Sequence, residues 1–371
     1  MRFDRKKPGG GVEIHCRLEN GKAWLGWKFH IQKDAAEPGG TAGNVTGVRA
    51  VQRAAGEGLT AGQSAPKSFT AKEGIAEGSV ASKTVVPGKL PDETYRGACQ
   101  VEVTVTDREG HLAAYGRKRL DEEEPLETLL LHPHSWSGME DPYLYRVEAC
   151  LLEPGGCPTD QVVLWLPLRE VAVHPEKGVL LNGKAFLPRA VRYVPPCGEG
   201  AGAAKALQME QMRQEFLLLK EMGANCIHYE AGKNGLYPYF LQLCDKYGFV
   251  VWEQKEGIPC RAVQDPAAGH LLDDRRRPTS LYYHYRAKWG REPFVYLAPE
   301  SIRRQENGTF LAVVYSNCSR VALYTDGQLH GILSGEEEFV FQEIPARHPC
   351  IMLSAEAEGC SMSLSLHKSL L

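Results

Sequence analysis

The 371-residue chain has no long apolar run and little net charge. No window approaches the ~18 consecutive apolar residues that a membrane-spanning helix needs, so we expect no membrane partner. A net charge of -3 gives no indication of nucleic-acid binding, and we expect no nucleic-acid partner. The first residues, MRFDRKKPGGGVEIHC, contain no apolar segment of a secretory signal, which favours a cytoplasmic location.

Metal and redox motifs are also scarce. The eleven cysteines include no C-x-x-C pair, which is typical of reduced, structural thiols. His132 and His134 lie two residues apart without a nearby third ligand, so a surface turn is favoured over a metal site. We therefore predict no metal and no cofactor.

One stretch, from about residue 38 to residue 88, contains almost no aromatic residue. It is rich in Gly, Ala, Ser and Thr, so it has little apolar surface to offset an ordering cost of about 1–2 kcal/mol per residue. We expect a long flexible insertion between strands.

Short alternating segments fill the rest of residues 1–170. VEIHCRL, CQVEVTVTD and QVVLWLPL are separated by Gly, Pro and Asp, and this two-residue period predicts an antiparallel β-sandwich. The same texture returns over residues 278–371, in TFLAVVYSN and RVALYTDG, and predicts a second, smaller sandwich.

Residues 171–277 alternate between strand and helix patterns. GKAFLPRAVRYV, ANCIHYE and FVVWE predict strands, and two helices are expected to end at Gly223 and Gly248. The first helix carries an apolar stripe of Met209, Met212, Phe216 and Leu219. Strands that alternate with helices through short loops are typical of a parallel sheet.

The order of these pieces resembles glycoside hydrolase family 2, the β-galactosidase and β-glucuronidase family. The resemblance lies in WSGMEDPYLYRVEACLL, LPLREVAVHPEKGVLLNGKAFLPRAVRY, LLLKEMGANCIHYE, LQLCDKYGFVVWEQ and RPTSLYYHYRAKWGREPFVYLAPE, and it covers roughly residues 130–371. It implies a mixed, mainly β fold: an immunoglobulin-like β-sandwich, an α/β middle derived from a TIM barrel, and a C-terminal immunoglobulin-like β-sandwich.

The resemblance also implies a retaining β-glycosidase, which uses two carboxylates about 5 Å apart. In the family the acid/base Glu follows an Asn at the end of the fourth barrel strand, yet no Asn-Glu dipeptide occurs in this sequence. A complete (β/α)₈ barrel takes ~250 residues, and the α/β part here has about 100. We expect a truncated barrel without either catalytic Glu.

The remaining barrel positions depart from the family pattern. Where the family has Arg-Gly-Val-Asn-x-His, this chain has Arg189-Ala190-Val191-Arg192-Tyr193-Val194. The family's acid after the third strand is replaced by Gln254. In the family these positions shape the sugar-binding pocket, so their changes suggest that this chain no longer needs the same pocket.

Candidate site residues remain at the strand ends. Glu253 and Glu256 are weak catalytic candidates, with a solvated pair as the favoured alternative. Arg189, His228, Glu230 and Trp252 are candidates for substrate binding. For His228 and Glu230 a local polar pair is favoured over sugar binding, and a core position would equally explain Trp252.

An aromatic run near residue 280 is predicted to pack the barrel remnant against the C-terminal sandwich; it consists of Tyr282, Tyr283, Tyr285 and Trp289.

Two functions follow as hypotheses. The first is a family 2 protein of carbohydrate metabolism, of ancestral β-galactosidase type, that is inactive on its own. The second is a non-catalytic carbohydrate-binding or assembly subunit. Three parallel strands leave an open sheet edge, which we expect the C-terminal sandwich, a homo-oligomer or a partner chain to cover.

Overall fold

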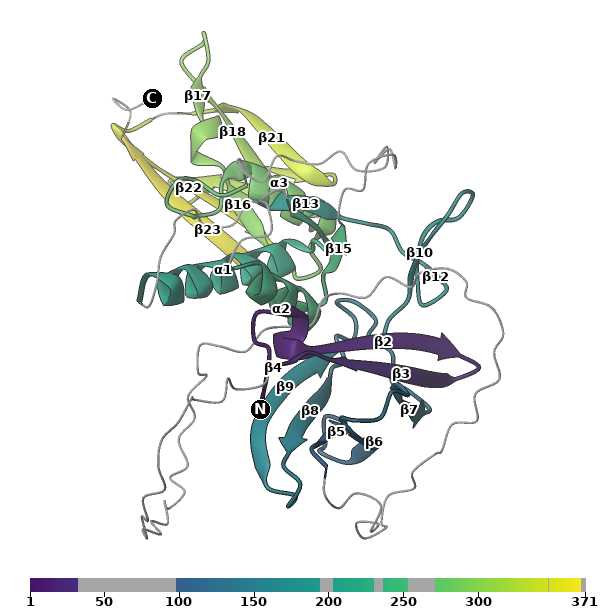
Figure 1. Cartoon of the computed structure of the whole chain (residues 1–371). Helices are drawn as coiled ribbons and strands as arrows, with labels where there is room; N and C mark the ends of the chain where they lie inside the picture. The colour runs from purple at the N-terminus through teal and green to yellow at the C-terminus, as the bar shows by residue number, and fades with distance from the viewer. Residues whose placement is uncertain (33–97, 194–202, 230–235, 253–270, 346, 368–371) are drawn as a thin grey trace. The chain divides into compact units, whose positions relative to one another are not determined.

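The computed structural model describes residues 1–32, 98–193, 203–229, 236–252, 271–345 and 347–367 (Figure 1). This part of the chain is mainly β, with several antiparallel sheets and few helices, as the sequence predicted. The predicted insertion at 38–88 lies outside the described residues. No helix among the described residues is long and apolar enough to cross a membrane.

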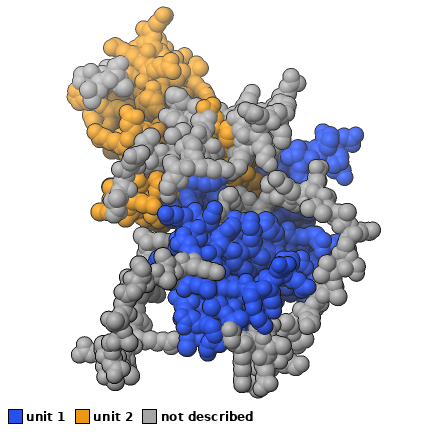
Figure 2. Space-filling model, viewed as in Figure 1, with its two compact units in different colours: residues 1–186, 237–246 blue, residues 187–236, 247–371 orange. Residues whose placement is uncertain are grey.

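The chain divides into two compact units (Figure 2). The first contains Met1–Phe186 with Tyr237–Lys246, and the second contains Leu187–Leu236 with Tyr247–Leu371. The second unit groups the parallel sheet with the C-terminal sheets. The boundaries predicted from the sequence, 1–170, 171–277 and 278–371, stay a prediction.

The first unit contains a sandwich of two antiparallel sheets, ordered β2-β3-β7 and β6-β5-β8-β9. One core joins them, with Ile14 and Leu25 from one sheet and Val103 and Val147 from the other. The strands are β2 (Val12–Glu19), β3 (Lys22–Phe29), β5 (Gln100–Thr106), β6 (Leu112–Arg119), β7 (Leu126–Leu131), β8 (Tyr145–Leu152) and β9 (Pro158–Leu166).

A glycine sets the distance between these sheets at one point. A Cβ on Gly116 of β6 would lie 2.5 Å from Cγ2 of Thr128 on β7. Thr128 also accepts a hydrogen bond of 3.0 Å from the buried indole of Trp27. Residue 116 must therefore be glycine for the Trp27–Thr128 contact to form under β6.

Small antiparallel sheets complete this unit. β1 (Arg2–Phe3) pairs with β4 (Ile31–Gln32), and the 3-10 turn η1 (Pro8–Gly11) precedes β2. A three-stranded sheet contains β10 (Val171–His174), β11 (Gly178–Leu181) and β12 (Lys184–Ala185). The sequence analysis did not predict this last sheet, because it assigned the region to the parallel-strand pattern.

Helix α2 (Tyr237–Tyr247) is held by a buried polar cluster of the first unit. The indole of Trp136 donates to the backbone oxygen of Asp245 at 2.8 Å. The guanidinium of Arg169 lies 4.2 Å from the Trp136 ring centroid and 2.6 Å from Oδ1 of Asp245. Both charged side chains are 3% exposed, so each compensates the desolvation of the other.

The second unit begins with the predicted parallel sheet, ordered β13-β14-β15. Its strands are β13 (Ala190–Tyr193), β14 (Cys226–Tyr229) and β15 (Val250–Trp252), and α1 (Ala203–Met222) connects the first two. The predicted stripe on α1 is confirmed for Met212, Phe216 and Leu219, which are buried, whereas Met209 is partly exposed.

The helix ends also agree with the sequence analysis. Gly223 follows α1 with φ +91°, and Gly248 follows α2 with φ +89°. L-residues avoid this left-handed region, so both glycines serve as helix stops.

Helix α3 (Ser280–Trp289) was not predicted as a helix. The hydroxyl of its buried Tyr282 donates to the backbone oxygen of Leu218 on α1 at 3.0 Å. The Tyr283 ring stacks on Tyr296 at 3.5 Å. The aromatic run thus packs α1 against the C-terminal sheets, as predicted.

The C-terminal part of the second unit is a second antiparallel sandwich, as predicted. One sheet has the order β16-β18-β17 with β21 also on β18, and the other has the order β20-β19-β22-β23. The elements are β16 (Val295–Leu297), η4 (Pro299–Ser301), β17 (Arg303–Arg304), β18 (Phe310–Ser316), β19 (Arg320–Thr325), β20 (Gln328–Ser334), β21 (Glu337–Ile344), β22 (Cys350–Ala357) and β23 (Cys360–His367).

Replacing Arg169 by Met would leave the buried Asp245 without its cation. We expect the first unit to lose about 3–5 kcal/mol of unfolding free energy at about pH 7. Burial raises the pKa of Asp245 in the folded state, so the deficit should shrink as pH falls and the carboxyl takes up a proton. Urea unfolding at about pH 7 and about pH 5 measures this change. The double variant Arg169→Met/Asp245→Leu should recover stability; an equal deficit at both pH values would contradict the argument.

Replacing Gly223 by Ala should destabilise the second unit. A Cβ there would overlap the backbone oxygen of Trp289 and lie 2.5 Å from its carbonyl carbon. We expect a loss of about 3–4 kcal/mol in urea unfolding. Gly359→Ala is the matched control, since Gly359 also has a positive φ (+82°) but open space around it. The control should cost only the backbone strain, about 1–2 kcal/mol; equal losses would show that the contact with Trp289 contributes nothing.

Candidate functional site

The candidate site lies at the carboxyl end of the parallel sheet. Arg192 of β13 is in register with His228 of β14, and His228 is in register with Trp252 of β15. Neighbouring strands lie about 4.8 Å apart, so these three positions form one row across the sheet. Arg192 and His228, as neighbours in this row, point to the same face.

The opposite face of the sheet packs against α1. Tyr193 follows Arg192, and its hydroxyl donates to Oε2 of Glu215 on α1 at 2.6 Å. Its ring also lies 5.4 Å from that of Phe216. Because side chains alternate along a strand, Arg192 and His228 point away from α1. In a closed (β/α)₈ barrel that direction is the interior, where chemistry gathers at the strand ends.

Arg192 and His228 are both partly exposed. A guanidinium provides hydrogen-bond donors in a fixed planar array, and an imidazole can donate or accept. Such a pair can bind sugar hydroxyls or a carboxylate. It provides no carboxylate to act as nucleophile.

Arg189 lies away from this row. Its guanidinium donates to the backbone oxygen of Trp289 at 3.1 Å. It stands three residues before Arg192, about 10 Å along the strand direction. Burial, and secondarily the charge of Arg291, lowers the pKa of Arg189. The observed contact gives Arg189 a structural role, and its predicted role in substrate binding stays a prediction.

The other predicted residues cannot be placed in the site. Glu230, Glu253 and Glu256 lie outside the described residues. For Trp252 the structure describes the backbone of β15 alone. Their roles therefore stay predictions. Arg192 carried no site prediction from the sequence, because its place beside His228 depends on the strand register.

Asn225 aligns the three strands. Its side chain accepts a hydrogen bond of 2.7 Å from the backbone N–H of Arg189 and donates one of 3.0 Å to Leu187. Its backbone oxygen accepts the N–H of Val250 at 2.9 Å. The buried side-chain amide thus ties β14 to the segment that leads into β13, and the backbone oxygen of the same residue ties it to the start of β15.

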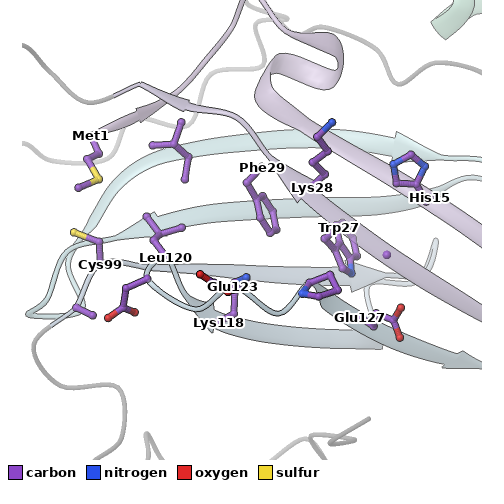
Figure 3. A pocket seen from close by; sticks show the side chains of 15 residues that line it. Met1, His15, Trp27, Lys28, Phe29, Cys99, Lys118, Leu120, Glu123 and Glu127 are labelled. Carbon is purple, nitrogen blue, oxygen red and sulfur yellow. The ribbon is translucent and has the colours of Figure 1, made fainter. Parts of the chain in front are cut away.

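A separate open cleft of about 1000 Å³ lies in the first unit (Figure 3). Phe29, Lys28 and Lys118 are among its lining residues. Nζ of Lys118 already donates to the backbone oxygens of Glu122 and Glu124, and Nζ of Lys28 lies 3.8 Å from Glu13. The cleft therefore offers no converging set of reactive groups among the described residues.

A group of potential metal ligands lies at the turn between β5 and β6. Asp107, Glu109 and His111 are close enough to share an ion. The Asp107 carboxylate already accepts the backbone N–H of His111 at 2.7 Å and contacts its ring at 3.1 Å. These bonds explain the cluster as a turn.

Comparisons with known proteins agree with this geometry. The chain is 31% identical over 183 residues to a β-glucuronidase of Bacteroides fragilis, a match that covers 48% of the chain and 25% of that protein. It is 32% identical over 132 residues to a β-galactosidase of Lactococcus lactis, covering 34% and 12%. No protein-family model matches the chain.

Solved structures share the fold. An FMN-binding β-glucuronidase of F. prausnitzii matches with a TM-score of 0.67 at 15% identity, over 99% of this chain and 75% of that one. A family 2 member from Bacteroides cellulosilyticus matches with a TM-score of 0.57 at 14% identity, over 99% and 63%. The chain is thus related to glycoside hydrolase family 2 through distant homologues, and it shares the fold of solved members.

The relationship is distant and partial. The matched regions span 25% of the Bacteroides fragilis β-glucuronidase and 12% of the Lactococcus β-galactosidase. The family predicted from the sequence is confirmed.

Asn225→Ala should loosen the candidate site. Two buried backbone groups, the carbonyl of Leu187 and the N–H of Arg189, would lose their partner, at a cost of about 2–4 kcal/mol. Urea unfolding and amide exchange in β13–β15 measure the change. Gln342→Ala, at an exposed position in the same unit, is the control and should be neutral. Unchanged exchange in Asn225→Ala would show that the amide does not set the register.

Proposed function

We propose that this chain is a glycoside hydrolase family 2 protein that binds β-glycosides and does not hydrolyse them on its own. The observation that carries the proposal is the row at the carboxyl end of the parallel sheet. Its described side chains are Arg192 and His228, whereas retaining hydrolysis needs two carboxylates about 5 Å apart.

The sheet itself supports a shortened barrel. In the described residues the parallel sheet has three strands, and a closed barrel of this family's type has eight. The resemblance to the family implies that both catalytic Glu residues would lie on later barrel strands. The acid/base Glu follows an Asn in the family, and the sequence contains no Asn-Glu dipeptide, which agrees with the loss of that position.

Helix α3 supports the same proposal. In a closed (β/α)₈ ring the last helix packs beside the first, and α3 contacts α1 through Tyr282 and through an ion pair of 2.9 Å between Arg286 and Glu221. We infer that α3 corresponds to the final helix of the barrel. The chain would then pass from the third barrel strand to this last helix without the units between them.

The ligand is proposed to be a β-glycoside because the matched relatives are β-glucuronidases and β-galactosidases. Arg192 and His228 would donate to its hydroxyl or carboxylate oxygens. Trp252 would stack on the sugar ring if its side chain shares their face.

A second candidate is an assembly subunit. Among the described residues β15 pairs with β14 alone, and β13 likewise has one neighbour. A second copy or another chain could add strands at these edges. Light scattering across a concentration series separates this candidate from a monomeric binding protein.

The purified chain should show no turnover of aryl β-glucuronides or β-galactosides, and a mechanism-based inactivator should leave no covalent adduct by mass spectrometry. Without two positioned carboxylates the rate should fall by several orders of magnitude. Turnover that co-purifies with the protein, and persists in Glu253→Gln and Glu256→Gln, would overturn the proposal.

Binding is tested separately by calorimetry with the same glycosides. Arg192→Ala and His228→Ala should each weaken binding about tenfold, the effect of losing about 1.4 kcal/mol. His330→Ala, on the C-terminal sandwich, should leave binding unchanged. No binding by the folded wild-type chain would exclude a glycoside-binding role.

A further inference from the structure

Glu215 is a buried carboxyl group on the apolar stripe of α1. It is 1% exposed, and Met212, Phe216 and Leu219 of the same stripe are also buried. Burying a carboxylate among apolar side chains is costly unless its charge is compensated. Its partners therefore determine how α1 is held.

The two partners of Glu215 come from different parts of the second unit. The hydroxyl of Tyr193, at the end of β13, donates to Oε2 at 2.6 Å. Nη1 of Arg276 lies 3.4 Å from Oε1, and Oε1 has no hydrogen bond in the described part of the chain. The charge of Arg276 is thus the compensation available to that oxygen.

Arg276 is presented by a turn that is built around Asp273. Oδ1 of Asp273 accepts the backbone N–H groups of Arg275 at 2.9 Å and Arg277 at 2.8 Å. The backbone N–H of Arg276 donates to the backbone oxygen of Asp273 at 2.7 Å. Arg276 has φ +60°, a left-handed conformation that costs about 1–2 kcal/mol for an L-residue.

The strained conformation needs a compensating contact. Strain of this kind persists where surrounding interactions hold it, and the contact with Glu215 is the interaction that the Arg276 side chain makes with α1. The turn lies directly before α3, whereas Tyr193 ends the strand that carries Arg192. Glu215 therefore connects the end of β13, α1 and the segment that leads into α3.

We propose that Glu215 is an acid-sensitive latch: its carboxylate holds Arg276 and the 273–277 turn against α1, and its protonation releases the turn. The inference is independent of the glycoside proposal, since it concerns only the second unit's own contacts. Tyr193 from β13 and Arg276 from the turn are the titratable side chains that act on Glu215 from the elements packed against it.

The direction in which the pKa of Glu215 is shifted favours release of the 273–277 turn before the second unit unfolds in acid. Burial raises the pKa of Glu215, while Tyr193 and Arg276 lower it. The pKa of Glu215 is higher in the folded state than in the unfolded chain. Its contribution to the free energy of unfolding is therefore present at low pH and is lost as pH rises through the folded pKa. Protonation therefore removes the ion pair without destabilising the whole unit.

The carboxyl of Asp273, which organises the turn, titrates at lower pH. Hydrogen bonds from Arg277, first through its backbone and then through its side chain, lower the pKa of Asp273. As pH falls, Glu215 therefore takes up its proton while the Asp273 carboxylate still bonds to the backbone of the turn.

Hydrogen exchange of the full chain, corrected for intrinsic rates, tests the latch. In the wild type, protection of the Asp273 and Arg276 amides should fall about tenfold as pH decreases through the titration of Glu215. Arg276→Ala and Glu215→Gln should show the low protection at every pH. Arg275→Ala, the matched control in the same turn, should behave as the wild type.

Two outcomes would overturn the latch. The first is wild-type protection and pH dependence in Arg276→Ala, which removes only the surface partner and should fold even if Glu215→Gln does not. The second is a pH dependence that disappears in Asp273→Asn and persists in Glu215→Gln, which would assign the titration to Asp273.

Discussion

The close approach of α1 and α3 is the constraint on which the second unit depends. Gly223 ends α1 in a left-handed conformation and leaves room for the backbone of Trp289 at the end of α3. Tyr282 then reaches Leu218, and Arg189 reaches the same Trp289 carbonyl from the start of β13. One residue without a side chain thus allows α3, which packs on β18 and β21, to lie against α1.

We propose that this arrangement preserves the scaffold of the family without its chemistry. Asn225 keeps three strands in register, and that register presents Arg192 and His228 at the end where family members carry out catalysis. Retaining hydrolysis depends on a pair of carboxylates held at a fixed separation, whereas binding needs only donors and a surface. Arg192 and His228 meet the second requirement, and this is the basis of the proposed binding role.

The sequence predicted elements where local signals and tertiary packing agree. The apolar stripe and Gly223 marked α1, and apolar segments between helices marked β13 to β15. Helix α3 was missed because its tyrosines are weak helix formers and its stability comes from Tyr282 and Tyr283 packing on other elements. Thr279 before it and Gly290 after it were usable boundary signals.

The candidate site was less predictable than the fold. Arg189 was chosen by family resemblance, but the structure directs its guanidinium to the Trp289 carbonyl. Arg192 was missed because the row with His228 depends on strand register, which a sequence does not state. Glu215 carried no sequence signal beyond a charge on an apolar stripe, since its partners are 22 and 61 positions away along the chain.

Most of α2 belongs to the first unit, whereas β14 and β15 on either side of it in the sequence belong to the second, so the first unit is discontinuous in sequence. The chain leaves that unit after Phe186, returns at Tyr237 and leaves again after Lys246. A gene fragment that stops at residue 186 would therefore encode Trp136 and Arg169 but not Asp245, which both of them contact. No single cut yields two intact units, so truncation at one position cannot separate them.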